Sequence, residues 1–133
     1  MDFSNVKTLA DMEPFFQTIK DNEPNIYAFE ATSRESAMRI LDFDTLNGDT
    51  CPGVVYNDTK DYKVFNQLAA PETKEHFELM HKFYEAGYIR EDAATVEDYT
   101  ADQKAGLMFA AVRSLKPGKD AEESNSIDRK SVV

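Results

Sequence analysis

At 133 residues the chain is long enough for one domain whose core needs neither disulfides nor metal. Its formal net charge of −10, from 15 basic and 25 acidic side chains, argues against binding to nucleic acid or to an anionic membrane surface. The single Cys51 cannot form an internal disulfide. No apolar run is long enough to span a membrane, and the first residues lack the features of a secretion signal. Two origins stay open, a cytosolic protein or a piece of a longer secreted one.

The first predicted element is a helix that opens at Thr8, with Asp11 in the capping position three residues later. Pro14 fits this helix only if the helix starts near Asp11, so that the proline lies in the first turn. The sequence at 23–25 is a stop signal, so the helix should end by Asn22. Its apolar stripe at helical spacing consists of Leu9, Met12, Phe15, Phe16 and Ile19.

Short strands and turns follow this helix. The elements predicted in order are a buried strand at 26–29, a helix at 33–41, a turn-rich connection at 42–53, and a hairpin with strands at 53–57 and 62–66 around a four-residue loop at 58–61.

The most strongly marked helix spans residues 71–87. Pro71 suits the first helical position because its missing N–H needs no partner there, and Gly87 suits the position after the last turn, where φ is positive. The predicted apolar face consists of Phe77, Met80, Phe83 and Tyr84. The predicted solvent face consists of Lys74, Glu75, Glu78, Lys82 and Glu85.

The last third of the chain alternates a short helix, a strand and turns. We expect a helix at 96–105 closed by Gly106, a strand at 107–112 that is buried on both faces, a turn at 116–119, one helical turn at 120–123, and a strand or loose end at 131–133. The whole pattern predicts the α/β class, with a small mixed sheet flanked by helices.

No group of residues announces an active site. His76 and His81 do not share a helical face and are interpreted as surface residues with local ion pairs rather than metal ligands. Asp42 and Asp44 lie in an acidic turn that lacks the register of a calcium loop, and an acid/base pair there is the less favoured interpretation. Cys51 has no obvious base nearby, so packing is favoured over nucleophilic chemistry.

Four stretches, in order, resemble the second lobe of extracellular solute-binding proteins of ABC transporters. They are a loop, helix and strand opening at 7–27, the run Tyr-Glu-Ala-Gly-Tyr-Ile-Arg-Glu-Asp-Ala-Ala-Thr at 84–95, the Lys-Ala-Gly run with a buried strand at 104–109, and the segment 116–122. The last of these is similar to a segment of lipoprotein members that bind sugars or oligosaccharides. Members of this family are usually much longer, with a signal peptide, a lipid-attachment cysteine and two lobes. The resemblance therefore implies a fragment.

The resemblance implies a lobe of the type II periplasmic-binding-protein-like fold, with residues 1–133 as one α/β domain and 120–133 as a loose tail. It implies capture of a solute, expected to be a carbohydrate, and delivery to an ABC transporter permease by closure of two lobes. It further implies no catalysis, no cofactor, no metal and no nucleic acid. The full-length protein is expected outside the cytoplasm, attached to the membrane only through a lipid anchor absent from this chain.

Ligands of open α/β lobes bind at the carboxyl ends of strands. The resemblance therefore makes five residues candidates for contact with the solute. They are Glu30, Thr32 and Arg34 after the strand at 26–29, and Arg113 and Ser114 after the strand at 107–112. Tyr56 and Tyr62 could offer aromatic faces to a sugar, but packing within the hairpin is the favoured use.

Two other classes of protein stay open. An acidic α/β protein-interaction module with no transport role is the main rival, and it would present an exposed apolar patch to a protein partner. An enzyme ranks third, because the sequence shows no convergent set of titratable groups.

Overall fold

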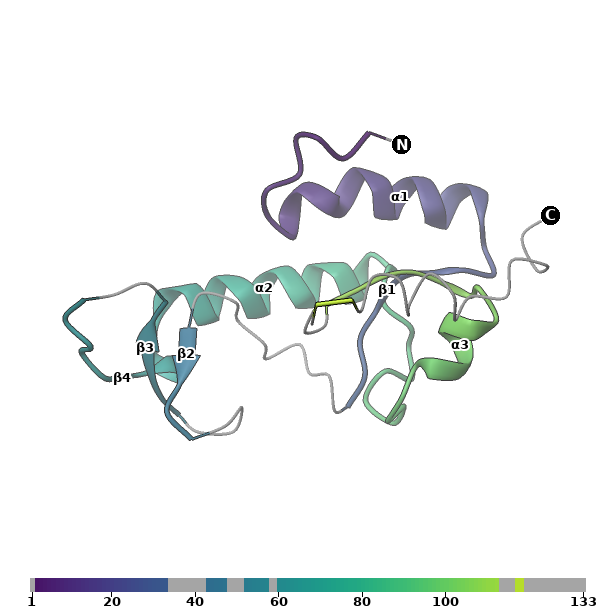
Figure 1. Cartoon of the computed structure of the whole chain (residues 1–133). Coiled ribbons are helices and arrows are strands. Elements are labelled where there is room, and N and C mark those ends of the chain that lie inside the picture. The colour runs from purple at the N-terminus through teal and green to yellow at the C-terminus, as the bar shows by residue number, and fades with distance from the viewer. Residues whose placement is uncertain (1, 34–42, 48–51, 58–59, 113–116, 119–133) are drawn as a thin grey trace. The chain divides into compact units, whose positions relative to one another are not determined.

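A computed structural model describes residues 2–33, 43–47, 52–57, 60–112 and 117–118 (Figure 1). The chain forms two compact units. Unit 1 comprises Met1–Ser36 and Phe83–Val133, and unit 2 comprises Ala37–Lys82. The class is mixed α/β with small sheets flanked by helices, as the sequence predicts, although the described residues form two small sheets instead of one.

Unit 1 begins with the predicted N-terminal helix. The Thr8 N–H and hydroxyl both donate to Asp11 Oδ2, at 2.8 and 2.9 Å, and the Asp11 N–H donates back to the Thr8 hydroxyl at 3.4 Å. This reciprocal cap starts a 3-10 turn, Ala10–Met12, which continues as α1, Glu13–Asn22. Pro14 lies in the first turn of α1, so both the start and the end of this helix are confirmed.

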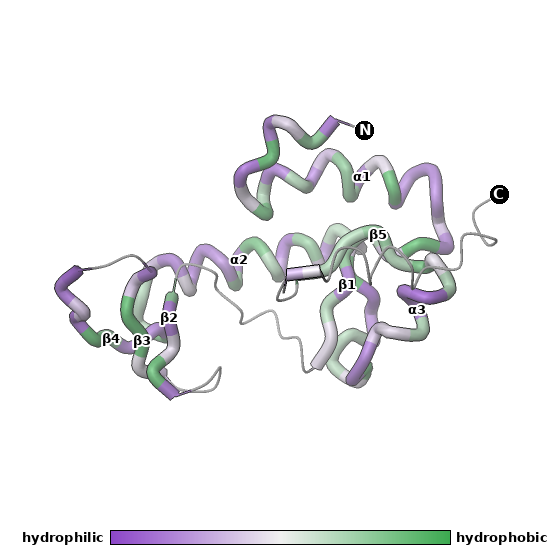
Figure 2. The backbone as a smooth tube through the Cα atoms, in the orientation of Figure 1, coloured by the Kyte–Doolittle hydropathy of each residue, from purple (hydrophilic) through white to green (hydrophobic). Residues whose placement is uncertain are grey.

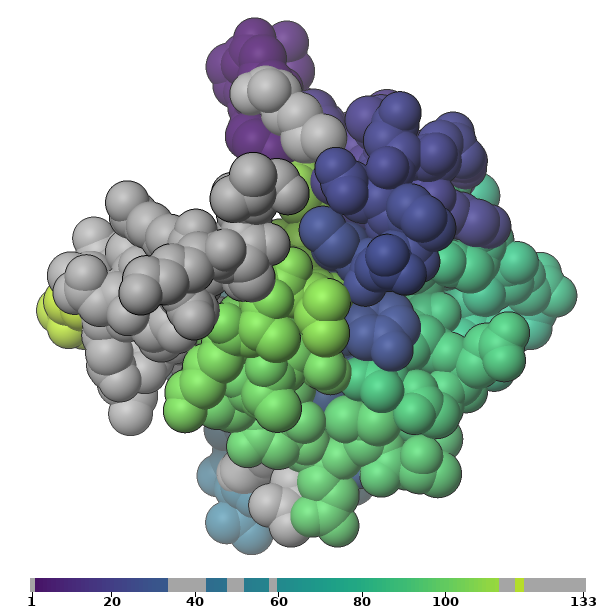
Figure 3. Space-filling view, turned by 90° about the vertical axis from the view of Figure 1, so that its right-hand side faces the viewer, coloured from purple at the N-terminus to yellow at the C-terminus, as the bar shows by residue number. Residues whose placement is uncertain are grey.

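The sheet of unit 1 has two parallel strands, β1 (Tyr27–Glu30) and β5 (Met108–Ala111), with Tyr27 opposite Met108. All four residues of β5 are half-buried, so the prediction that this strand is buried on both faces is wrong. Helix α3, Thr100–Lys104, precedes β5 in the chain and begins later than predicted. The light-green residues around α3 lie against the dark-blue residues that follow α1 in the space-filling view (Figure 3).

The core of unit 1 is an aromatic cluster centred on Phe16 of α1, which is fully buried. The Phe16 ring centroid lies 5.4 Å from Phe29 of β1 and 5.4 Å from Phe83 at the end of α2. Tyr88 and Phe109 complete the cluster at 5.9 and 6.4 Å. Every α1 and β1 residue named here lies on the apolar stripe or strand that the sequence predicts.

Helix α2 spans Pro71–Glu85, as predicted, and ends in a Schellman motif. Gly87 has φ 72°, its N–H donates to the Tyr84 carbonyl at 2.9 Å, and the Tyr88 N–H donates to the Phe83 carbonyl at 3.0 Å. Polar and apolar residues alternate along α1 and α2 (Figure 2). The boundary between the two units falls within α2, after Lys82.

The buried face of α2 differs in part from the prediction. Met80 and Phe83 are buried, but Phe77 and Tyr84 are 38% and 48% exposed, whereas Thr73 is buried. The buried face of α2 thus includes Thr73, a residue that hydropathy alone would assign to solvent. All five residues of the predicted solvent face are exposed.

Unit 2 contains an antiparallel sheet with the order β2-β3-β4, formed by Phe43–Thr45, Gly53–Tyr56 and Phe65–Asn66. The predicted hairpin is confirmed as β3 and β4, with Val54 opposite Phe65, but its second strand is shorter than expected. Strand β2 was expected to be part of a turn-rich connection, and that prediction is wrong. A 3-10 turn, Gln67–Ala69, leads into α2.

The core of unit 2 is small and consists of Phe43, Val54 and Ala70 with Phe65 packed against them. Three predicted elements lie outside the described residues. These are the helix expected at 33–41, apart from Ser33, the helical turn at 120–123, and the end at 131–133, so the expected loose tail at 120–133 stays a prediction.

Candidate functional site

The carboxyl ends of the two parallel strands lie at the same edge of the unit 1 sheet. Glu30, the last residue of β1, pairs with Ala111, the last residue of β5. Beyond β1, the Ser33 N–H and hydroxyl both donate to the Val96 carbonyl oxygen, at 2.9 and 3.0 Å. We call residues 31–33 and Val112 the carboxyl edge. Open α/β folds bind ligands at such edges, so the structure brings together the two strand ends that the sequence analysis singled out.

The five predicted contact residues divide into two groups. Glu30 and Thr32 are 3% and 4% exposed, so neither side chain meets solvent in this structure. Arg34, Arg113 and Ser114 lie outside the described residues. Arg34 follows Ser33 in the sequence, and Arg113 and Ser114 follow Val112, so all three stay candidates for solute contact next to the carboxyl edge.

Glu30 is packed against Arg90, which follows α2. The Glu30 side chain has no exposed area, and its Oε1 lies 3.5 Å from Arg90 Nη1. This distance is long for a charge-assisted hydrogen bond, which measures about 2.7–2.9 Å. Neither carboxylate oxygen accepts a hydrogen bond from a described residue. Burial raises the pKa of Glu30, and the nearby positive charge of Arg90 only partly offsets that effect.

Arg90 makes its shorter bonds to two other carboxylates. Its Nε donates to Asp92 Oδ1 at 2.6 Å and its Nη2 to Asp92 Oδ2 at 3.2 Å, while Nη1 donates to Asp102 Oδ2 of α3 at 2.6 Å. The guanidinium carbon lies 4.5 Å from the centre of the Tyr27 ring. The bonds to Asp92, followed by the bond to Asp102, raise the pKa of Arg90, and the bonds between Arg90 and Asp92 lower the pKa of Asp92. Arg90 therefore links β1 to α3.

Sequence reasoning missed this cluster, because Arg90 and Asp92 were considered only as part of the run that resembles solute-binding proteins, and neither side chain was given a role. One signal was available: Arg90 follows the apolar pair Tyr88-Ile89 directly and precedes Asp92 by two positions. Both Tyr88 and Ile89 are buried, which carries the arginine into the interior beside β1.

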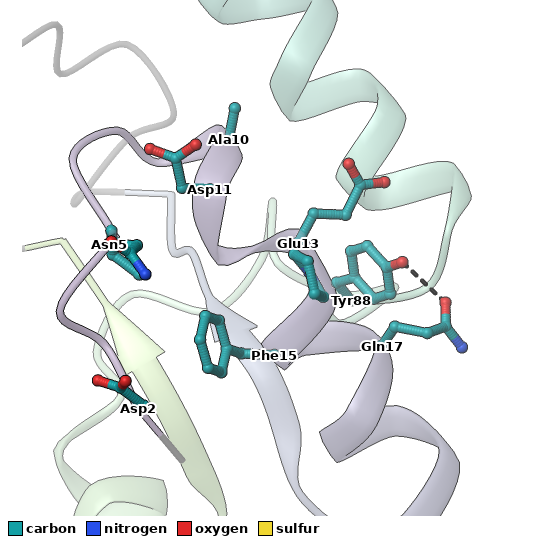
Figure 4. A pocket seen from close by; sticks show the side chains of 10 residues that line it. Asp2, Asn5, Ala10, Asp11, Glu13, Phe15, Gln17 and Tyr88 are labelled. Atoms are coloured by element: carbon teal, nitrogen blue, oxygen red, sulfur yellow. Dashed lines mark hydrogen bonds between the residues drawn. The ribbon is translucent and has the colours of Figure 1, made fainter.

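An open hollow of about 740 Å³ lies between the N-terminal segment and α1 in unit 1 (Figure 4). Phe15 projects into it, and the Tyr88 hydroxyl donates to Gln17 Oε1 at 2.8 Å at its side. Two of its acidic groups, Asp2 and Asp11, accept hydrogen bonds from nearby backbone N–H groups and so stabilise the local backbone. The lining consists of Asp2, Asn5, Val6, Ala10, Asp11, Glu13, Pro14, Phe15, Gln17 and Tyr88.

The two tyrosines of the hairpin region behave differently. Tyr56 packs at 4.6 Å from Phe65 and 5.4 Å from Phe43, and its hydroxyl donates to Glu72 Oε1 at 2.9 Å, so hairpin packing is confirmed for it. For Tyr62 the packing prediction is wrong, because its side chain is 72% exposed. Tyr62 also adopts φ 47°, which is uncommon for a bulky residue.

Residues considered for metal binding or catalysis do not converge in the described part of the chain. No group of three or more His, Cys, Asp or Glu side chains that could hold a metal ion occurs there. Asp44 is exposed, and Asp42 and Cys51 lie outside the described residues. None of the described helices is both long enough and apolar enough to cross a membrane.

No protein-family model matches this chain. Comparison with solved structures assigns the fold to the solute-binding proteins of transport systems. The chain matches a crystal structure of the N-glycan transport solute binding protein NgtS from Streptococcus pneumoniae with a TM-score of 0.80 and 28% identity, over 95% of this chain and 28% of that one. A crystal structure of NgtS with Man5GlcNAc matches with a TM-score of 0.79 and 28% identity, over 94% of this chain and 27% of that one.

In sequence, the chain is 32% identical over 127 residues to a carbohydrate ABC transporter substrate-binding protein of Streptococcus pneumoniae serotype 4 (strain ATCC BAA-334 / TIGR4). The match covers 96% of this chain and 25% of that protein, so the chain spans about a quarter of the length of the relatives it matches. The resemblance to solute-binding proteins of ABC transporters is thereby confirmed: this chain is a homologue of one part of such a protein.

Proposed function

We propose that this chain is one part of a solute-binding protein that captures a carbohydrate and delivers it, chemically unchanged, to an ABC transporter permease. The observation that carries the proposal is the structural match over 95% of the chain to a protein named for N-glycan transport, at 28% identity. That protein has crystal structures in complex with Man1GlcNAc and with Man5GlcNAc. An oligosaccharide of mannose and N-acetylglucosamine is therefore the first solute to test.

The proposed solute contacts are the residues that follow the carboxyl edge in the sequence. Arg34, Arg113 and Ser114 supply guanidinium and hydroxyl groups, which donate hydrogen bonds to sugar hydroxyls. Glu30 and Thr32 are buried, so their proposed part is to hold the backbone of the carboxyl edge in place by packing, without touching the solute. This assignment keeps all five predicted residues at one site and gives them two different roles.

The proposed mechanism is closure of two lobes around the solute, with no catalysis and no cofactor. This chain contributes one lobe or part of one, and the permease and an extracytoplasmic location belong to the proposal for the whole protein. A single lobe presents only half of a site. Its affinity alone should therefore be weak, with a dissociation constant of about 1 mM, which corresponds to only about −4 kcal/mol.

An NMR titration tests this proposal. Man5GlcNAc is added to the ¹⁵N-labelled chain, and a gluco-oligosaccharide of similar size serves as the control ligand. Progressive amide shifts at residues 31–33 and Val112, reduced in Arg34→Ala but unchanged in the exposed-helix control Lys74→Ala, support the proposed site. The absence of any shift up to about 10 mM ligand contradicts carbohydrate binding by this chain, and saturation at about 1 μM ligand contradicts the half-site.

A further inference from the structure

Three carboxylates face one guanidinium at the end of β1. Asp92 and Asp102 each lie 2.6 Å from Arg90, whereas Glu30 lies 3.5 Å away. Opposite charges interact more strongly at shorter distance, so the two aspartates neutralise the single positive charge. Glu30 is then the third acid in a cluster that has one base.

The surroundings of Glu30 disfavour its ionised form. Its side chain has no exposed area, and neither oxygen accepts a hydrogen bond from a described residue. A buried carboxylate without hydrogen bonds is far more costly than a buried neutral acid. Four groups of the described chain face Glu30 or its partner Arg90: Asp92 and Arg90 from the segment after α2, Asp102 from α3, and Tyr27 from β1 itself.

We propose that Glu30 and Arg90 form a pH-sensitive latch beneath the carboxyl edge, closed while the Glu30 carboxyl carries its proton and loosened when that proton is lost. The connection to the edge is short. Glu30 is the last residue of β1, and Ser33, three residues later, is held to Val96 by two hydrogen bonds. An ionised Glu30 competes with Asp102 for Arg90 Nη1, or draws water into the interior, and either change displaces this strand end.

The effect of burial on Glu30 supports the same direction. Because burial raises its pKa in the folded chain, the neutral form persists at pH values where the unfolded chain is already ionised. The stability that this group contributes is fully present below the unfolded pKa and is lost as the pH rises through the folded pKa. The latch is thus closed in more acidic solution. As a regulator of solute binding it rests on the proposed function, since the edge it holds is the proposed contact site.

The test is a ¹³C NMR titration of the Glu30 carboxyl, with the chain in denaturant as the reference. We expect a midpoint above the denatured value and a Ser33 amide resonance that shifts with the same midpoint. In Glu30→Gln, which keeps the shape of a neutral acid, the Ser33 titration should disappear while the chain stays folded. The matched control Glu78→Gln, at an exposed position of α2, should leave the Ser33 titration unchanged.

Each contrary result overturns the latch. A Glu30 midpoint at or below the denatured value means that Arg90 binds an ionised partner. A raised Glu30 midpoint without a matching shift of the Ser33 amide means that the carboxyl edge does not respond to ionisation of Glu30. A Glu30→Gln variant that fails to fold means that the charge itself is required. No sugar is present in any of these measurements, so a chain that fails to bind carbohydrate leaves their outcome intact, and the two proposals fail separately.

Discussion

Replacing Phe16 by alanine is expected to destabilise the protein by about 3–5 kcal/mol. Phe16 is fully buried, and its ring contacts the four aromatic rings that form the core of unit 1. Burial of a phenylalanine side chain contributes about 1.5–3 kcal/mol, and each well-oriented aromatic pair adds about 0.5–1.5 kcal/mol. These contributions overlap and do not add, so the expected loss is the range of about 3–5 kcal/mol typical of buried aromatic-to-alanine substitutions, the cavity included.

Urea denaturation followed by far-UV circular dichroism measures this loss. The chain has no tryptophan, so tyrosine fluorescence provides a second probe, and agreement between the two probes checks that unfolding is a single transition. A chain of this size has a total stability of about 5–15 kcal/mol, so the variant should retain only part of it.

The matched control is Phe3→Ala, because Phe3 belongs to the same unit but is 45% exposed. Its expected cost is about 1 kcal/mol or less, as for other exposed positions. If Phe16→Ala costs no more than Phe3→Ala, the aromatic cluster does not stabilise unit 1 and the reasoning is refuted.

Three further changes test local features of the chain. Gly87→Ala should cost about 1–2 kcal/mol in urea denaturation, because φ is 72° and a Cβ atom would lie 3.0 Å from Lys20 Nζ. Asp102→Asn should cost about 1–2 kcal/mol in the same assay, because Arg90 loses a charged partner at a largely buried position. Asp11→Ala should lower the melting temperature at neutral pH, and the difference from the parent chain should vanish in strongly acidic solution. The N–H bonds to Asp11 lower its pKa, so its contribution is present above the ordinary aspartate value and lost as the pH falls through the lowered one.

Each of these changes has a control in the same chain. Gly118 also has a positive φ, of 79°, but no atom of a described residue lies within 4 Å of the Cβ added in Gly118→Ala, so this change should cost less than the change at Gly87. Asp44→Asn removes an exposed carboxylate and should alter neither the urea midpoint nor the melting temperature at neutral pH. Equal effects in variant and control would contradict the contacts to which the losses are attributed.

Local signals in the sequence predicted a helix well where residues close to its ends fix where it starts and stops. The N-terminal helix is capped by Thr8 and Asp11, and α2 starts at Pro71 and ends before Gly87. These signals act within a few residues of each helix end, so no tertiary contact is needed to recognise them. Strand β2 was missed because Phe43–Thr45 is short and polar, and its pairing with β3 decides its conformation. Such pairing is a tertiary contact that sequence spacing does not record.

The candidate site was predictable only in outline. Placement of Glu30 at a strand end followed from the apolar run before it, but its burial against Arg90 depends on the path of the chain after α2. Whether a charged side chain lies inside or outside is a property of the packed structure. The sequence therefore suggested solute contacts where the structure shows, at Glu30, an internal acid.

The parallel pairing of β1 with β5 has a consequence for how the polypeptide acquires its structure. Tyr27 meets Met108 only after all of unit 2 has left the ribosome, since Ala37–Lys82 lies between the two strands in the chain. Closing so long a loop is entropically costly and slow, whereas the antiparallel hairpin of unit 2 closes locally. During synthesis, the edge of β1 that pairs with β5 lacks this partner until residues 108–111 have been made. We therefore expect this edge of β1 to be open to misassociation for longer than the strands of the hairpin.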